Sequence, residues 1–188
     1  VGRGANLGVL IRDAETLQTL EKIDTLIVDK TGTLTEGKPR LTDDMAAEGV
    51  DGDDPLSYAA AIEGSSEHPL ATPIVEAAKE RGVKRRKAEN VEATTGAGIE
   101  GTVDGETVRI GTLDFVSQSA EVPESITKEA EDQRSSGRTV MFVSRDDKVI
   151  GLLAVEDAIK ETTPDALDTL REEGIHVIMA TGDNKRTA

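Results

Sequence analysis

A lone aspartate follows an apolar run of strand type and opens a loop of small polar residues in the stretch VDKTGTLT, residues 28–35. A carboxylate at the end of a buried strand carries a desolvation cost unless a charged or hydrogen-bonding group meets it. Held beside Lys30, backbone N–H groups and a cation, the carboxylate of Asp29 can act as a nucleophile towards phosphorus. Gly32 lets the backbone approach a phosphoryl group closely, and the hydroxyl of Thr33 can donate a hydrogen bond to its oxygens. The pattern predicts a phosphoryl-transfer loop.

A second loop of the same type lies near the end of the sequence. Thr181, Gly182 and Asp183 follow the apolar stretch 175–180, and in open α/β sheets ligands bind at the carboxyl ends of the strands. An aspartate after a strand most often caps a turn, but two strands that end in similar polar loops favour a phosphate site. Thr181 would donate a hydrogen bond to the phosphoryl group, and a magnesium ion would offset the charge of carboxylate and phosphate together.

The composition argues against several classes of protein. With 22 basic and 37 acidic residues the formal net charge is −15, which repels nucleic-acid phosphates and anionic lipid. The sequence contains no cysteine, so disulfides and thiolate metal sites are not available. The longest apolar stretch, 149–155, is far too short to span a bilayer, and the start of the sequence does not read as a signal peptide. We therefore expect a soluble, cytoplasmic chain with no nucleic-acid partner and no disulfide partner.

The two ends of the chain share one pattern, in which a buried strand is followed by a polar loop. A short helix is predicted after its aspartate cap Asp13, and a buried strand over 25–28. Towards the other end, Thr163 is the predicted cap of a helix with Pro164 at its first position. A second buried strand is predicted over 175–180, directly before the second polar loop.

The middle of the chain has the pattern of a different, more antiparallel unit. Asp104-Gly105, flanked by Val103 and Val108, is a strong hairpin signal. We therefore expect an α/β domain that is interrupted by an inserted α+β domain. The predicted inserted unit also contains helices over 55–63, from Pro69 onwards and over 124–136, and strands over 139–144 and 149–155 that pair around Asp146-Asp147.

Gly96, Gly98 and Gly101 form the dinucleotide-binding pattern G-x-G-x-x-G. That motif requires a helix directly after it, because the helix N-terminus meets the pyrophosphate. The predicted hairpin 103–110 occupies the place of that helix, so the dinucleotide interpretation fails.

The stretch DKTGTLT, followed far downstream by TGDN, resembles the P-type ATPases, ion pumps that form an aspartyl phosphate. The element SEHPL at 66–70 is similar to the heavy-metal-transporting branch, most of all to the copper pumps. The resemblance implies a phosphorylation domain of the haloacid-dehalogenase fold, incomplete here, with an inserted α+β nucleotide-binding domain built on an antiparallel sheet. It places the phosphorylation domain at 1–40 and 150–188 and the nucleotide-binding domain at 41–149. Matching motifs also lie at 8–11, 96–98 and 155–160, so the resemblance runs along essentially the whole chain.

The resemblance also implies roles for individual residues. Asp29 would be phosphorylated by ATP with Mg²⁺ as the cofactor, and Thr31 would supply a backbone carbonyl to that ion beside the Asp29 carboxylate. Thr181, Gly182 and Asp183 would form the second phosphate-contacting loop. The implied ATP-binding residues of the inserted domain are Glu67, His68, Gly96, Gly98, Gly111 and Thr112.

Two departures from the family bear on activity. Thr112 stands where the copper pumps have an asparagine that helps to hold the nucleotide. The sequence also stops before the family's later lysine and its GDGxNDxP loop, and the ion-selecting membrane helices lie outside it. We expect a cytoplasmic portion of an integral protein of a prokaryotic plasma membrane. On its own it would bind ATP but barely hydrolyse it, and its transported cation would be bound elsewhere.

Two other functions stay open at this point. Soluble phosphatases of the same fold usually place a second aspartate two residues after the nucleophile, where it acts as general acid and base; here that position is Thr31. A non-catalytic nucleotide-binding module is the other alternative. Flanking sequence that encodes apolar helices and a GDGxNDxP loop would favour the pump over both.

The net charge of −15 generates a prediction about salt. If the acidic surface reflects a salt-rich cytoplasm, molar potassium chloride will raise the melting temperature, because it screens the self-repulsion of the chain. Thermal unfolding at low and at molar salt measures the effect. A flat or falling melting temperature would instead indicate an ordinary acidic domain.

Overall fold

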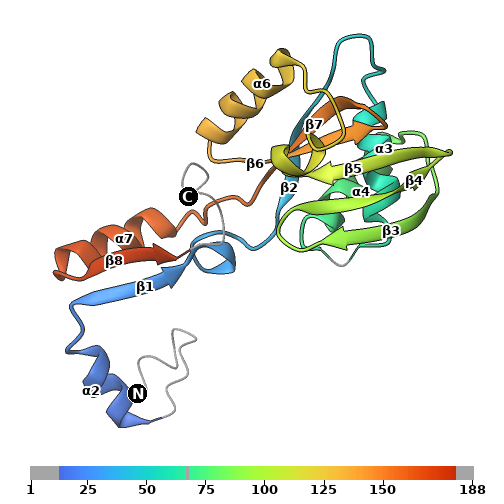
Figure 1. Ribbon diagram of the computed structural model, residues 1–188. Helices are drawn as coiled ribbons and strands as arrows, with labels where there is room; N and C mark the ends of the chain where they lie inside the picture. The colour runs from blue at the N-terminus through green and yellow to red at the C-terminus, as the bar shows by residue number, and fades with distance from the viewer. Residues whose placement is uncertain (1–12, 67, 181–188) are drawn as a thin grey trace. The chain divides into compact units, whose positions relative to one another are not determined.

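A computed structural model describes residues 13–66 and 68–180 (Figure 1). The described chain divides into two compact units, 13–35 with 159–180 and 36–158. The sequence predicts domain boundaries at 40/41 and 149/150, a few residues inside the second unit. The strands at these positions pair with each other from Arg40↔Glu156 to Ala46↔Gly151, which explains why the compact unit includes both of them completely. The assignment of domains stays a prediction.

The first unit is built around two parallel strands. β1 (Thr25–Asp29) pairs with β8 (His176–Ala180) from Thr25↔His176 to Asp29↔Ala180. A parallel pair requires a crossover connection, and α7 (Thr163–Glu172) forms its last part before β8. α2 (Ala14–Leu20) precedes β1 and is capped by Asp13, whose carboxylate accepts hydrogen bonds from the Thr16 N–H at 2.7 Å and hydroxyl at 2.8 Å. These bonds lower the pKa of Asp13, as expected when the charged form is the acceptor.

Two predictions for this unit are wrong. Thr163 is the first residue of α7 and not its cap, since the cap position is Thr162. The strands β1 and β8 are not buried: Ile27 is 67% exposed and its register partner Ile178 is 44% exposed. A parallel strand is buried only when helices cover both faces of its sheet. In the described chain α7 packs on β8, while the face that carries Ile27 and Ile178 is open.

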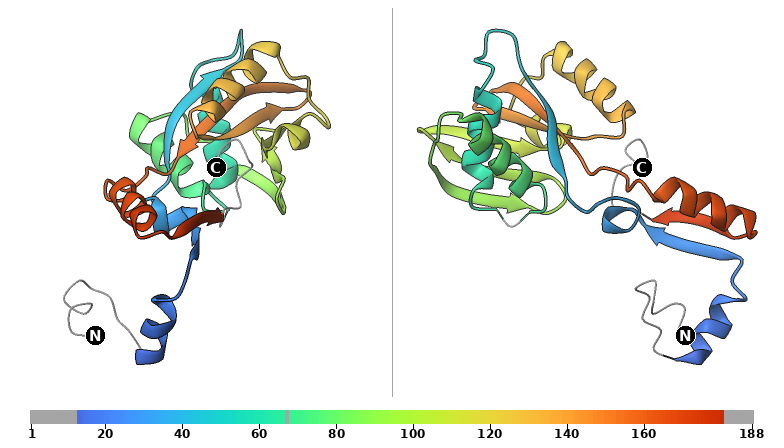
Figure 2. Two further views of the ribbon diagram at one scale, coloured as in Figure 1. Left: turned by 90° about the vertical axis from the view of Figure 1, so that its left-hand side faces the viewer. Right: turned by 180° about the vertical axis from the view of Figure 1, so that it is seen from behind.

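The second unit is a six-stranded antiparallel sheet in the order β2-β7-β6-β5-β4-β3, with helices on both faces. Seen from behind, α3 and α4 lie in front of the sheet (Figure 2, right). The predicted inserted α+β unit on an antiparallel sheet is confirmed. Its strands are β2 (Arg40–Ala46), β3 (Ala88–Thr94), β4 (Gly98–Val103), β5 (Glu106–Gly111), β6 (Thr139–Arg145) and β7 (Lys148–Glu156), and its helices are α3 (Asp54–Glu63), α4 (Ala71–Arg81), α5 (Leu113–Val116) and α6 (Glu124–Ser135).

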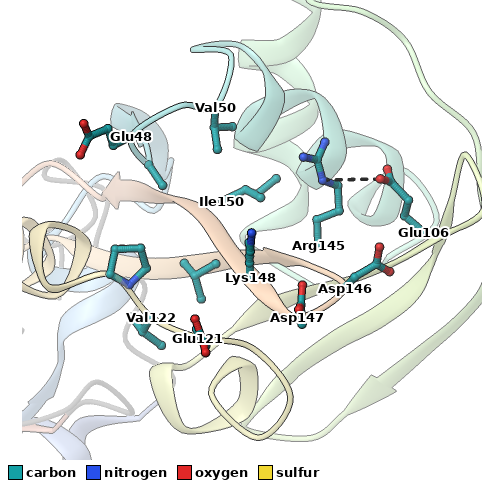
Figure 3. Close-up of a pocket in the computed structure, with 13 residues that line it drawn as sticks. Glu48, Val50, Glu106, Glu121, Val122, Arg145, Asp146, Asp147, Lys148 and Ile150 are labelled. Atoms are coloured by element: carbon teal, nitrogen blue, oxygen red, sulfur yellow. Dashed lines mark ion pairs between the residues drawn. The ribbon is translucent and has the colours of Figure 1, made fainter.

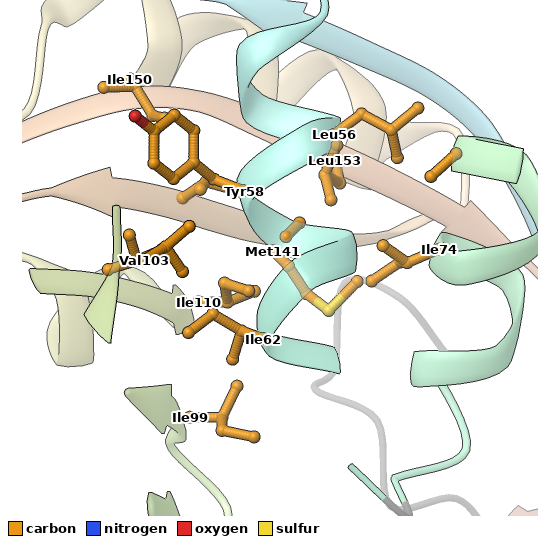
Figure 4. Close-up of a cluster of buried hydrophobic side chains, with 14 of the residues drawn as sticks. Leu56, Tyr58, Ile62, Ile74, Ile99, Val103, Ile110, Met141, Ile150 and Leu153 are labelled. Atoms are coloured by element: carbon orange, nitrogen blue, oxygen red, sulfur yellow. The ribbon is translucent and has the colours of Figure 1, made fainter. Parts of the chain in front are cut away.

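Side chains that alternate along the strands form two hydrophobic cores. In β6, Met141 and Val143 join the core under α3 and α4, while Val140 and Phe142 join the core under α5 and α6. This alternation is the period of two that a strand between two helical layers requires. Figure 4 shows the first core, in which Ile62 of α3 lies beside side chains of β4 and β5.

Local turn chemistry fixes the hairpins. Asp104 and Gly105 have φ of 53° and 88°, the left-handed values that a two-residue hairpin turn requires, and they join β4 to β5. Asp146, with φ of 51°, lies in the turn between β6 and β7. Both hairpins are where the sequence predicts them, and a hairpin rather than a helix follows the three glycines of the G-x-G-x-x-G pattern. No helix within the described ranges is long and apolar enough to cross a membrane.

Candidate phosphorylation loop and nucleotide site

Asp29 lies at the carboxyl end of β1 and is exposed. Its register partner in β8 is Ala180, the residue directly before the predicted second loop. Thr181, Gly182 and Asp183 themselves lie outside the described residues. Because the two strands are parallel and in register, the points where both predicted loops begin are side by side at one edge of the sheet.

The loop after Asp29 is a wide turn over Lys30–Leu34 that depends on Gly32. Gly32 has φ of 75°, a left-handed conformation that other residues adopt at a cost. The buried Thr35 closes the turn: its hydroxyl accepts from the Gly32 N–H at 3.0 Å and donates to the Lys30 carbonyl at 3.2 Å. Thr31 and Thr33 stay exposed. Sequence reasoning gave Gly32 a role at the phosphate and missed the role of Thr35.

Residues from the far end of the crossover also hold this loop. The ammonium group of Lys160 donates to the carbonyls of Gly32 at 2.8 Å and Thr33 at 3.0 Å. The Thr163 hydroxyl donates to the Leu34 carbonyl at 2.7 Å. Sequence reasoning did not include Lys160 among the site residues, because a contact between residues so far apart leaves no local signal.

The described part of the chain has no group of three or more His, Cys, Asp or Glu side chains placed to hold a metal ion. The ligands that the resemblance implies for a magnesium ion at this loop are the Asp29 carboxylate and the Thr31 carbonyl. Oxygen ligands of this kind suit Mg²⁺, which usually takes one or two carboxylates and completes its shell with water and substrate phosphate. The donor set is compatible with the ion but incomplete without these other ligands.

His68 lies in the loop between α3 and α4 and is exposed. Its Nδ1 accepts from the Leu70 N–H at 3.2 Å, and its own N–H donates to the Ser66 hydroxyl at 3.1 Å. The first bond holds the ring against the backbone of its own loop and leaves Nε2 as the nitrogen for a ligand, while the second involves only the His68 backbone. Glu67 lies outside the described residues.

Glu63, at the end of α3, is a candidate ligand-binding residue that the sequence alone did not reveal. It is 4% exposed, and its Oε2 is a buried oxygen without a hydrogen-bond partner. Burial raises the pKa of Glu63, while the Ser66 hydroxyl and the charge of His68 act in the opposite direction. A buried unpartnered oxygen needs an explanation, and a ligand is one. An acid in the last turn of an apolar helix, where the helix dipole disfavours it, is the sequence signal that marks this residue.

The predicted glycines differ in what they do. Gly96 has φ of 73° and open space around it, so it serves the turn between β3 and β4. Gly98 is in close contact with its own protein: an added Cβ would meet the Ile110 carbonyl and would lie 2.6 Å from Cδ1 of Phe115. Gly98 pairs with Gly111, and a Cβ on Gly111 would meet the Ala97 carbonyl. Packing alone therefore requires Gly98 and Gly111, whatever they contribute to the nucleotide.

Thr112 caps α5, because its hydroxyl oxygen accepts from the Phe115 N–H at 3.3 Å. Its N–H donates to the Ala97 carbonyl at 2.8 Å. The structure thus joins Gly98, Gly111 and Thr112 in one corner of the sheet. Ile62, the residue before Glu63 in α3, and Ile99, the residue after Gly98 in β4, belong to the same hydrophobic core (Figure 4).

A cavity of about 460 Å³ lies elsewhere in the second unit, around the turn between β6 and β7 (Figure 3). Val108 pairs with Arg145 and Gly111 with Phe142, so this cavity and the Gly111 corner lie towards opposite ends of β5. Two basic residues line the cavity, Arg145 and Lys148, and Arg145 is already bound to Tyr58 and Glu106. The acidic residues of its lining would repel a polyphosphate, and none of the predicted site residues lines it. These acidic residues are Glu48, Glu106, Glu121, Asp146 and Asp147.

Comparisons with known proteins agree with the resemblance in the sequence. A model of the haloacid dehalogenase-like hydrolases matches residues 23–188. A copper-transporting P-type ATPase of Rhizobium leguminosarum bv. viciae is 51% identical over 100% of this chain and 22% of its own length. A copper-exporting P-type ATPase of Legionella pneumophila is 47% identical over 100% of this chain and 25% of its own length. A silver exporting P-type ATPase of Salmonella typhimurium is 43% identical over 100% of this chain and 23% of its own length.

Solved structures show the same similarity. A zinc-transporting PIB-type ATPase in the E2.Pi state has a TM-score of 0.67 at 35% identity, over 95% of this chain and 29% of that one. A structure of the catalytic domain of the CPx-ATPase CopB-B, described by its conformational changes upon nucleotide binding, is also similar. Its TM-score is 0.66 at 27% identity, over 94% of this chain and 60% of that one. The N-domain of HMA6, a copper-transporting P-type ATPase, has a TM-score of 0.53 at 25% identity, over 63% of this chain and 99% of that one. The resemblance to P-type ATPases is confirmed, for a chain that spans 22% to 25% of the length of these curated relatives.

The packing around Gly98 generates a prediction about stability. Gly98→Ala will lower the free energy of unfolding by about 1–3 kcal/mol, the usual cost of forcing a methyl group into a filled site. Gly52→Ala is the matched control, because Gly52 has no neighbouring atom within 4 Å of an added Cβ. Urea denaturation of the chain measures both. Equal stability of the two variants would contradict the packing role of Gly98.

Proposed function

The chain belongs to the haloacid dehalogenase-like hydrolase family, and from this we propose that it is the ATP-binding and phosphorylation region of a heavy-metal-transporting P-type ATPase. The observation that carries the proposal is the position of Asp29, which ends β1 in register with the residue before Thr181-Gly182-Asp183. Identity to copper-transporting P-type ATPases over the whole chain supports it. In the complete protein, ATP hydrolysis through an aspartyl phosphate would drive transport of a cation across a membrane.

In the proposed reaction a carboxylate oxygen of Asp29 attacks the γ-phosphorus of ATP, the bond to the bridging oxygen breaks, and ADP leaves. Lys30 adds positive charge, and Thr33 and Thr181 donate hydrogen bonds to the phosphoryl oxygens, where negative charge must be stabilised. Mg²⁺ would neutralise charge between the carboxylate and the phosphate. The Asp29 carboxylate and the Thr31 carbonyl are its proposed ligands, and Gly182 and Asp183 complete the second loop.

Thr31 favours the pump over a soluble phosphatase. A phosphatase releases its phosphoryl group quickly because a second aspartate activates water. A threonine cannot do so, and the phosphoenzyme would persist long enough for a change of conformation to occur.

The nucleotide would bind in the second unit. His68 offers its ring and Nε2, and Glu63 offers a buried carboxyl oxygen without a partner, a natural acceptor for the exocyclic amino group of adenine. Gly96, Gly98, Gly111 and Thr112 would line the same site, with Glu67 beside His68 in the chain.

Copper is the proposed cargo because relatives at 51% and 47% identity are described as copper pumps. A silver exporter is nearly as similar, so this region does not determine the metal. The cation would be bound by membrane segments outside this chain.

His68→Ala should weaken ATP binding by about 1–2 kcal/mol, the typical cost of one lost polar contact. Titration calorimetry with the 188-residue chain, without magnesium, measures the affinity. His176→Ala is the matched control, because the other histidine of the chain lies in β8. If both variants bind ATP like the parent, His68 does not contact the nucleotide.

Asp29→Asn should abolish phosphorylation, because an amide carries no charge and is not a competent nucleophile. The test is incorporation of label from γ-labelled ATP into an acid-stable, hydroxylamine-sensitive phosphoprotein, in the protein at its natural length. Asp24→Asn is the nearby control and should retain the label. The 188-residue chain alone should hydrolyse ATP barely above background. Label on the Asp29→Asn variant would mean that another residue is the nucleophile.

A further inference from the structure

The ammonium group of Lys160 binds two successive carbonyls of the loop that follows Asp29. The distances are 2.8 Å to the Gly32 oxygen and 3.0 Å to the Thr33 oxygen. Charge-assisted hydrogen bonds of this length are stronger than those between neutral groups. Two of them therefore fix the orientation of two adjacent peptide groups, in a loop whose Gly32 could otherwise adopt many conformations.

Fixing these carbonyls also fixes the donors on the other side of the loop. In a planar trans peptide the N–H points opposite to the C=O. With the Gly32 and Thr33 carbonyls turned to Lys160, the N–H groups of Thr33 and Leu34 point away from it. Backbone N–H groups in a loop are the donors that commonly bind phosphoryl oxygens. The lysine therefore determines which way the loop presents its donors.

Within the part of the chain that the structure describes, no acid pairs with the charge of Lys160. Among residues 13–66 and 68–180 no carboxylate forms an ion pair with it, and the partners of its ammonium group are the two neutral carbonyls. The side chain is half-buried, so its charge is less screened than that of a fully exposed lysine. It adds positive potential at a loop that, by the proposed function, receives a phosphoryl group.

Other contacts hold the end of this loop independently of the Lys160 ammonium group. The Thr163 hydroxyl and the Lys160 N–H both donate to the Leu34 carbonyl, at 2.7 Å and 3.0 Å, and Thr35 bridges with Ile159. These contacts hold the end of the loop whether or not the ammonium group is present. The Lys160 side chain acts one and two residues earlier, at the carbonyls of Thr33 and Gly32.

We propose that Lys160 is a positioning residue for phosphoryl transfer: its ammonium group holds the Gly32 and Thr33 peptides so that the loop presents its N–H donors to the phosphoryl group on Asp29. The inference rests on the proposed function, in which Asp29 is the acceptor. Lys160 is the second residue after the chain returns to the first unit at 158/159. The geometry of the loop is thereby tied to the segment that leads back from the nucleotide-binding unit.

Lys160→Met keeps the aliphatic stem and removes the charge. In the protein at its natural length, the rate of phosphoenzyme formation at saturating ATP should fall roughly ten- to a hundredfold, the scale of effect that a small misplacement of reacting groups produces. The affinity for ATP should not change, because the nucleotide residues lie in the other unit. Lys160→Arg should recover most of the rate. Thr163→Val is the matched comparison, and should lower the melting temperature more than the rate.

Asp29→Asn in the same experiment separates this inference from the proposed function. If the wild-type protein and the Asp29→Asn variant are labelled alike, the proposed function is wrong. If only Asp29→Asn loses the label and Lys160→Met reacts at the wild-type rate, Lys160 has no positioning role. A loss that Lys160→Arg does not restore, with an equal loss of thermal stability, would make Lys160 a structural anchor only. Should Lys160→Met not fold, Lys160→Gln replaces it, and an unchanged rate there would overturn the inference equally.

Discussion

The parallel pairing of β1 with β8 is the constraint on which the arrangement of this chain depends. Two parallel strands cannot be joined by a tight turn, and here the crossover contains the whole second unit and then α7. Because both strands run in the same direction, Asp29 and Ala180 end side by side, so the two predicted loops begin at one edge of the pair. A shift of one residue would turn alternate side chains to the other face. The register therefore decides whether the two loops can act on one phosphoryl group.

In the second unit the main constraint is a different one, because β4, β5 and α5 approach one another closely. Gly98 and Gly111 have no room for a Cβ, and Thr112 ends the strand by capping α5. A residue in this corner can therefore be required for packing even if it also lies near a ligand, so the presence of a glycine here is not evidence of binding. Buried Glu63, with an unpartnered oxygen and a raised pKa, is different: packing gains nothing from it, so its cost points more directly to a ligand than the glycines do.

Local chemistry explains what the sequence predicts well. The hairpin at Asp104-Gly105 and the cap at Asp13 depend on residues within a few positions of one another, and both lie where the sequence places them. Burial of β1 depends on how many layers cover it, which an apolar run does not reveal, and Ile27 is exposed. Lys160 binds Gly32 across a separation of 128 residues. Spacing along the chain cannot predict such a contact, and only the fold shows it.

The negative net charge of the chain limits how a polyphosphate could bind to it. A chain with a net charge of −15 repels a polyphosphate at long range. Among the described arginines several already have acidic partners: Arg86 pairs with Asp54 and Asp104, and Arg109 with Glu100. The long-range field of the surface therefore opposes the approach of ATP. By the proposed function, recognition would rest on short-range contacts at the adenine end, such as those offered by His68 and Glu63. In that proposal the negative charge of the phosphates would be met locally, where Lys30 begins the loop after Asp29 and Lys160 binds its carbonyls.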